Sequence, residues 1–138
     1  MNTKKLPERY IYPAVFTYYG PDKEIAVDFP DLGVATSGMD DTDALLSARE
    51  LLSITMLGLE EDGEEIPLPS PLSSLKLEEN ETTALVDIYM PSIRLAHENK
   101  SVSRTVTLPA WLNAAALERN FNFSQVLQEA LKERIGIL

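Results

Sequence analysis

The C-terminal end of the chain carries one strand pattern and two short helix patterns, which are too little to fold alone. Over residues 101–108, Val102, Val106 and Leu108 fall on one face, with Arg104 on the same side, and the other face carries only hydroxyl-bearing side chains. An alternation with a period of two predicts a strand with one buried face. Helix patterns follow over residues 110–119 and 124–134. A single strand would leave a free sheet edge and half a core, so we expect a second copy to supply the other strand.

Local chemistry predicts where the two C-terminal helices begin. Pro109 ends the strand and suits a first helical turn, because its fixed φ fits there and its missing N–H needs no partner. Ser124 is the expected N-cap of the second helix. Apolar side chains recur at helical spacing in both segments. The residues expected to form the dimer core are Val102, Val106, Leu108, Trp111, Val126, Leu127 and Leu131.

Charge is distributed unevenly along the chain. Residues 1–100 hold 8 Lys and Arg against 19 Asp and Glu, whereas residues 101–138 hold 4 against 3. An acidic body is repelled by nucleic acid and attracts a basic partner, so only the C-terminal segment tolerates phosphates. The alternative is that the acidic residues only keep the protein soluble.

The composition excludes several kinds of protein. The hydrophobic fraction of 44% and charged fraction of 25% are typical of a folded domain. The absence of cysteine excludes disulfides and thiolate metal sites. No apolar run reaches the roughly 18 residues that span a bilayer, and the start lacks a secretory core, so we expect a cytoplasmic protein. No phosphate-binding loop, zinc spacing or nucleophile motif is present, which predicts a protein that is not an enzyme and needs no cofactor or metal.

The N-terminal part predicts an antiparallel sheet and one long helix, hence an α+β fold. Runs of β-branched and aromatic residues are separated by turn residues, which favours a meander of three strands. Five apolar residues at helical spacing then form one stripe, expected to lie across the sheet: Leu45, Ala48, Leu52, Met56 and Leu59. The expected elements are strands at 10–19, 24–29 and 34–37, a helix from Asp40 or Asp41 to about Glu61, and a strand at 82–89 that its apolar character places centrally.

The order of these elements and several local sequences resemble HicB antitoxins. Asp28-Phe-Pro-Asp-Leu32, the alanines Ala44 and Ala48, and the stretch from Glu61 to Ser70 carry the N-terminal resemblance. The tail, with Leu108-Pro-Ala-Trp-Leu112 and residues 123–131, is similar to a ribbon-helix-helix module. The resemblance implies a partial RNase H-like domain over residues 1–90, a connector over 91–100, and a ribbon-helix-helix dimerisation and DNA-binding domain over 101–138.

A ribbon-helix-helix dimer places two antiparallel strands in the major groove of DNA. The hydroxyl face of the strand is then expected at the base edges, and the first turn of the last helix can hold a phosphate through its free N–H groups. The alternative is that the tail only dimerises. The residues expected at DNA are Lys100, Ser101, Ser103, Arg104, Thr105, Thr107, Asn122 and Ser124.

The resemblance also implies a protein partner, a small basic ribonuclease toxin of the HicA type. An acidic domain can cover a site built for phosphates, and its charge accelerates the encounter. Such an antitoxin represses its own operon, and a higher oligomer with the toxin remains an option. The residues expected to contact the toxin are Tyr12, Tyr18, Glu24, Asp28, Asp31, Glu60, Glu61 and Glu64.

Two other functions stay open at the level of the sequence. A stand-alone dimeric regulator would use its acidic domain to sense a ligand or to oligomerise. A metal-dependent nuclease would need carboxylates that converge on metal ions, and Asp28, Asp31 and Asp87 are the candidates. His97, the only histidine, is expected to be exposed and without a catalytic role.

Overall fold

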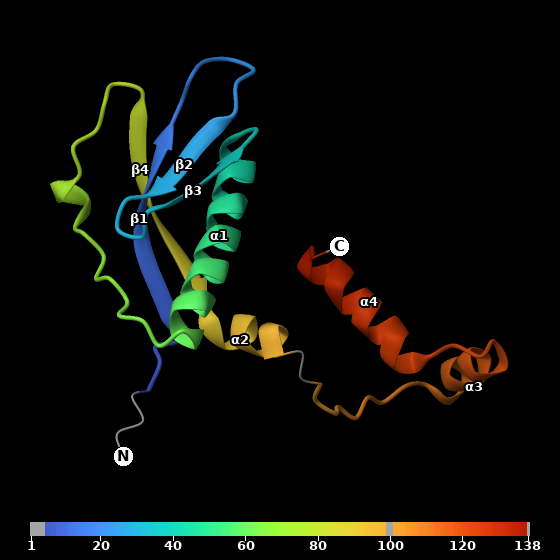
Figure 1. Ribbon diagram of the computed structural model, residues 1–138. Helices are drawn as coiled ribbons and strands as arrows, with labels where there is room; N and C mark the ends of the chain where they lie inside the picture. Colours follow the sequence, from blue (N-terminus) through green and yellow to red (C-terminus); the bar gives the residue numbers. More distant parts are fainter. Residues whose placement is uncertain (1–4, 99–100, 138) are drawn as a thin grey trace. The chain divides into compact units, whose positions relative to one another are not determined.

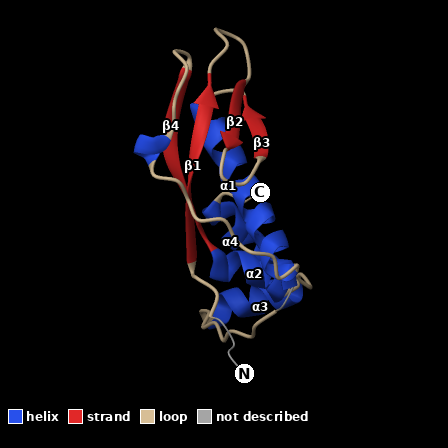
Figure 2. Ribbon diagram, turned by 60° about the vertical axis from the view of Figure 1, so that its left-hand side comes forward, coloured by secondary structure: helices blue, strands red, loops and turns tan. Residues whose placement is uncertain are grey.

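A computed structural model describes residues 5–98 and 101–137 of the chain. The chain divides into two compact units, residues 1–100 and residues 101–138. In the first unit, a four-stranded sheet carries a long helix on one face (Figure 1). The second unit contains two short helices (Figure 2).

The sheet is antiparallel throughout and has the order β3-β2-β1-β4. The meander formed by β1 (Arg9–Thr17), β2 (Ile25–Phe29) and β3 (Val34–Gly38) was predicted and is confirmed. The expected central position of β4 (Glu81–Tyr89) is wrong, because β4 pairs only with β1 and forms an edge of the sheet. The apolar run of β4 suggested a strand buried on both faces, but Leu85 is 55% exposed and faces away from the core.

The long helix α1 (Asp41–Glu61) is capped by Asp40, one of the two residues that the sequence offered as its N-cap. The Asp40 side chain accepts a hydrogen bond from the backbone N–H of Asp43, which satisfies one free donor of the first turn. The fully buried residues of the helix recur every four positions, so the observed core stripe is shifted from the predicted one. It consists of Ala44, Ala48, Leu52 and Met56, whereas Leu45 and Leu59 are only half-buried.

The core lies between α1 and the inner face of the sheet. Alternate residues of β1, among them Tyr10, Tyr12 and Phe16, point into it, as the period of a strand requires. From β2, Val27 and Phe29 are completely buried there. Alanines on α1 let the helix backbone come close to these larger side chains, and each large buried side chain contributes about 1.5–3 kcal/mol.

The segment between α1 and β4 is irregular except for a short turn, η1 (Leu72–Ser74). The Tyr12 hydroxyl donates to the carbonyl oxygen of Pro67, and the Ser70 N–H donates to Asp31 Oδ2 at 3.0 Å. These bonds hold the proline-rich segment against the first unit, where it runs as an irregular arm (Figure 1).

A helix occupies most of the segment that the sequence assigns to a connector. Helix α2 (Met90–Glu98) follows β4 directly and packs against α1. Met90 is completely buried, and its N–H donates to the carbonyl oxygen of Glu8 at 2.7 Å. Pro91 suits this first turn for the reason already given for Pro109. The expected connector at 91–100 is therefore mostly a helix of the first unit.

The second unit contains α3 (Ala110–Glu118) and α4 (Phe123–Ile135), close to the predicted ranges. The predicted N-cap of α4 is wrong, because Asn122, not Ser124, accepts the hydrogen bond from the N–H of Gln125. Both residue types cap well, so the sequence could not choose between neighbouring candidates. The segment before α3, expected to be a ribbon strand, carries no regular structure in the single chain.

Gly38 at the end of β3 allows the sheet and α1 to approach closely. A Cβ at this position would lie 2.3 Å from the backbone nitrogen of Ala44. We therefore expect Gly38→Ala to lower the free energy of unfolding by about 1–3 kcal/mol, measured by urea denaturation. The matched control is Gly58→Ala in α1, where an added Cβ meets open space. This change should raise the free energy of unfolding by about 0.5–1 kcal/mol, because alanine favours a helix more than glycine does. Equal effects of the two changes would contradict this packing.

Candidate functional site

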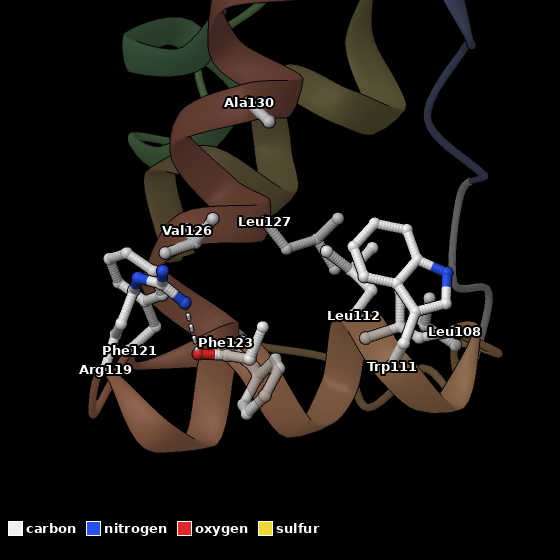
Figure 3. A pocket seen from close by; sticks show the side chains of 12 residues that line it. Leu108, Trp111, Leu112, Arg119, Phe121, Phe123, Val126, Leu127 and Ala130 are labelled. Atoms are coloured by element: carbon white, nitrogen blue, oxygen red, sulfur yellow. Dashed lines mark hydrogen bonds between the residues drawn. The ribbon is translucent and has the colours of Figure 1, made fainter.

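The second unit exposes an apolar surface that it cannot cover by itself. None of the described residues from 101 to 137 is buried. A cavity of about 710 Å³, hereafter the tail cavity, opens between the segment before α3, α3 and the first turns of α4 (Figure 3). Large apolar side chains line it, including Trp111, which is 72% exposed, and Leu127. Contiguous apolar surfaces of this kind mark interaction sites.

Most of the predicted dimer residues lie in this cavity. Val106, Leu108, Trp111, Val126 and Leu127 line it, whereas Val102 and Leu131 are exposed outside it. Phe121, which lies between the two helices, also lines the cavity and had no role in the sequence prediction. Its position in a turn segment, outside both helical patterns, is the reason that it was missed.

The residues expected at DNA fall into two groups. Those of the first group are exposed side chains in the segment without regular structure, namely Ser101, Ser103, Arg104, Thr105 and Thr107. Lys100 lies outside the described residues.

The second group stands at the N-terminus of α4. Asn122 caps the helix, and the Ser124 hydroxyl accepts a hydrogen bond from Gln128 Nε2 at 3.1 Å. The free N–H groups of the first turn are therefore next to Asn122 and Ser124, as predicted.

The residues expected to contact a toxin do not form one continuous site. Tyr18 donates a hydrogen bond to Asp41 at the first turn of α1, and Glu24 lies at the neighbouring strand end, where it accepts a bond from Ser37. Glu60 and Glu61 lie in the last turn, and exposed Glu64 follows. A helix of this length separates the two groups by about 30 Å. One partner would have to cover the whole helix to contact both.

Glu60 has a structural role, because it is held inside an ion pair. Arg94 of α2 binds it through two nitrogens, with Nη2 at 2.7 Å from Oε2, and the Tyr10 hydroxyl donates to the same oxygen at 2.7 Å. The Glu60 side chain is only 6% exposed. The hydrogen bond from Arg94 lowers the pKa of Glu60, and burial raises the pKa of Tyr10. This cluster joins α1, β1 and α2.

The remaining predicted contact residues differ in how much surface they offer. Tyr12 is 2% exposed and has little to present, while Asp31 is engaged by Ser70. Asp28 is exposed on the sheet face that points away from α1, and its pKa is raised by desolvation and by the charge of Glu81. Glu61 contacts His97 of α2, which is exposed as expected.

The carboxylates proposed for metal binding do not converge. Asp28 pairs across the sheet with Val15, whereas Asp87 pairs with Ile11, four residues away along β1. Asp87 is also engaged by Arg9 at 3.3 Å and by Arg49 at 3.4 Å. Over residues 5–98 and 101–137, no three acidic or histidine side chains are placed to hold a metal ion. In the same parts of the chain, no helix combines the length and apolar character needed to span a membrane.

The partly buried pair of Glu60 and Arg94 predicts a pH-dependent effect on stability. Arg94→Met leaves Glu60 without its counter-charge, so we expect a loss of about 1–3 kcal/mol at neutral pH. Because the pKa of Glu60 is lowered in the folded state, the contribution is present above its ordinary value of 4.5 and disappears as the pH falls through the folded value. The difference between variant and wild type should therefore shrink below about pH 4, measured by denaturation across pH.

The matched control is Arg49→Met, which removes an ion pair whose two side chains are 49% and 43% exposed. This change should cost less than about 1 kcal/mol at every pH. A difference between Arg94→Met and wild type that stays constant with pH would contradict the structural role of Glu60.

Comparison with known proteins identifies similar structures. No family model and no curated protein sequence matches the chain. A chain of a toxin-antitoxin complex from Streptococcus pneumoniae is 28% identical, with a TM-score of 0.57, and the match covers 91% of this chain and 99% of that one. The antitoxin HicB of Burkholderia pseudomallei is 22% identical, with a TM-score of 0.51, and covers 91% and 98%. The resemblance noted in the sequence is thus confirmed, and the chain has the fold of the HicB antitoxins.

Proposed function

We propose that this chain is an antitoxin that binds and inhibits a basic ribonuclease toxin of the HicA type and represses its own operon as a ribbon-helix-helix dimer. The observation that carries the proposal is the second unit, in which no described residue is buried although many side chains are large and apolar. The acidic first unit and the two similar structures support the antitoxin role.

A second copy of the tail is the simplest cover for the tail cavity. Residues 101–108 alternate as a strand does, but the single chain provides no strand to pair with them. Pairing with the same segment of another copy would give a two-stranded ribbon and would bring Val106 and Leu108 of both chains over the helices. The symmetry of such a pair is two-fold, as in most homodimers.

The ribbon then carries the proposed DNA contacts on its outer face. Ser103, Thr105 and Thr107 alternate with the apolar residues and would meet base edges from both copies. Hydroxyl side chains can donate or accept, and a threonine methyl can touch a thymine methyl. The N-terminus of α4, capped by Asn122, is suited to a backbone phosphate.

The first unit is the proposed inhibitor. It holds all of the excess negative charge, and exposed carboxylates stand at both ends of α1, namely Asp41 and Asp43 at its start and Glu61 and Glu64 at its end. Such a surface complements a protein that binds RNA phosphates, and long-range attraction raises the association rate.

A tail deletion tests the division of labour between the two units. Removal of residues 101–138 should leave the first unit folded, because its core contains only residues of that unit. We expect the truncated chain to co-purify with the small basic protein encoded by the adjacent gene and to protect RNA from it, while operator binding in gel-shift assays is lost. An adjacent gene that encodes no basic partner, together with ligand-dependent operator binding by the full chain, would favour a stand-alone regulator.

Substitution on the hydroxyl face tests the DNA contacts. Thr105→Ala should weaken binding to the operator by about tenfold and leave binding to random DNA unchanged, because only a base contact is lost. Arg104→Ala, which removes a charge one position away, should weaken both by similar factors and reduce the salt dependence. Fluorescence anisotropy at two salt concentrations separates these outcomes. Identical effects of the two changes on both DNAs would contradict the orientation of the ribbon.

A further inference from the structure

The helix α1 is apolar on two sides, although only one side packs against the sheet. The buried side carries Ala44, Ala48, Leu52 and Met56. The outer side carries Leu46, which is 57% exposed, and Ile54, which is 63% exposed. These two residues lie eight positions apart, so they stand on one stripe, two turns from each other.

This outer stripe contributes little to the stability of the first unit. A surface helix normally carries charged and polar residues on the side opposite its core stripe. Leu46 and Ile54 instead expose more than half of their area to water. This exposed area contributes no burial free energy to the fold. Surface hydrophobic residues of this kind are suited to the centre of an interface when polar residues surround them.

The charges around the stripe are almost all negative. Glu50 lies between Leu46 and Ile54 on the same stripe, four residues from each. Two further acids stand at the ends of the helix: Asp43, which accepts a hydrogen bond from the Met39 N–H, and Glu61, which contacts His97. The only basic residue of α1, Arg49, reaches Asp87 of β4 and so is already engaged. The outer face of α1 therefore offers apolar contacts within an acidic rim.

The position of Glu50 argues against a second copy as the occupant. In an antiparallel pair of α1 helices in which Leu46 meets Ile54 of the other copy, the two Glu50 side chains would face each other across the symmetry axis. Like charges in contact are unfavourable, and residues 1–100 already carry a large negative excess. A partner that presents a cation flanked by apolar side chains would instead complement both Glu50 and the two apolar residues Leu46 and Ile54.

We infer that the outer face of α1 is the docking surface for a basic protein partner, which places a lysine or arginine on Glu50 and apolar side chains over Leu46 and Ile54. This inference rests on the proposed function, because it takes the toxin as that partner. It assigns the contact to one helix face, rather than to the sheet face that carries Asp28 or to the buried pair of Glu60 and Arg94.

Affinity measurements on the full chain test this assignment, with the basic protein encoded by the adjacent gene as the probe. The double change Leu46→Gln and Ile54→Gln should raise the Kd by about 30- to 100-fold, since central apolar contacts dominate interfaces. Glu50→Arg should raise it by about tenfold or more and weaken its salt dependence. Glutamine and arginine both favour a helix, so thermal unfolding should be unchanged in both variants. Operator binding should also be unchanged, because the proposed DNA contacts lie in the second unit.

The matched controls are Leu85→Gln, an exposed apolar residue on the opposite face of the sheet, and Glu79→Arg, an exposed acid in the segment that precedes β4. Both should bind the probe as wild type does. If the α1 variants bind the probe with the same Kd as wild type, this inference is overturned and the proposed function still stands. A wild-type chain that does not bind the probe would overturn both. A wild-type oligomer larger than a dimer that dissociates in the Leu46 and Ile54 variant would assign the face to a second copy and overturn the inference.

Discussion

The surface of the tail depends on one constraint, namely that two short helices and the irregular segment before them cannot bury their own apolar side chains. In the second unit every described residue keeps contact with solvent, even Trp111 and the leucines of α3 and α4. Burial of apolar area is the main favourable term in folding, so a chain with this surface gains most by covering it with another. Dimerisation and DNA binding are coupled in this scheme, because the same strand would supply the seam and the reading face.

The first unit meets the opposite condition, since it has a closed core and fixed connections between its elements. Arg94, Glu60 and Tyr10 hold α2 against α1 and β1, and Met90 is buried at the start of α2. The body that would meet a toxin therefore extends through Glu98, well beyond the last strand. Leu46, Glu50 and Ile54 on the outer face of α1 take no part in the cluster of Arg94, Glu60 and Tyr10, which separates residues that stabilise the unit from those available to a partner.

The sequence predicted the elements with strong local signals. The meander, the start of α1 to within one residue and both tail helices were found because turn residues, caps and periodicity are local properties. The sequence did not predict the edge position of β4 or the helix α2, because both depend on contacts between distant segments. It also missed the cap at Asn122, because Ser124 nearby is an equally good capping residue. Among the candidate contact residues, Tyr12 and Glu60 could not be recognised as buried, because a tyrosine or glutamate carries no local sign of its tertiary partner.

Sedimentation equilibrium of the full chain at micromolar concentration tests the central claim most directly. The account predicts a dimer, and it predicts that Leu127→Glu, which places a charge in the tail cavity, yields a folded single subunit with the first unit intact. A wild-type chain that remains a stable single subunit over the same concentrations would contradict the account, because the apolar surface of the tail would then have no second copy to cover it.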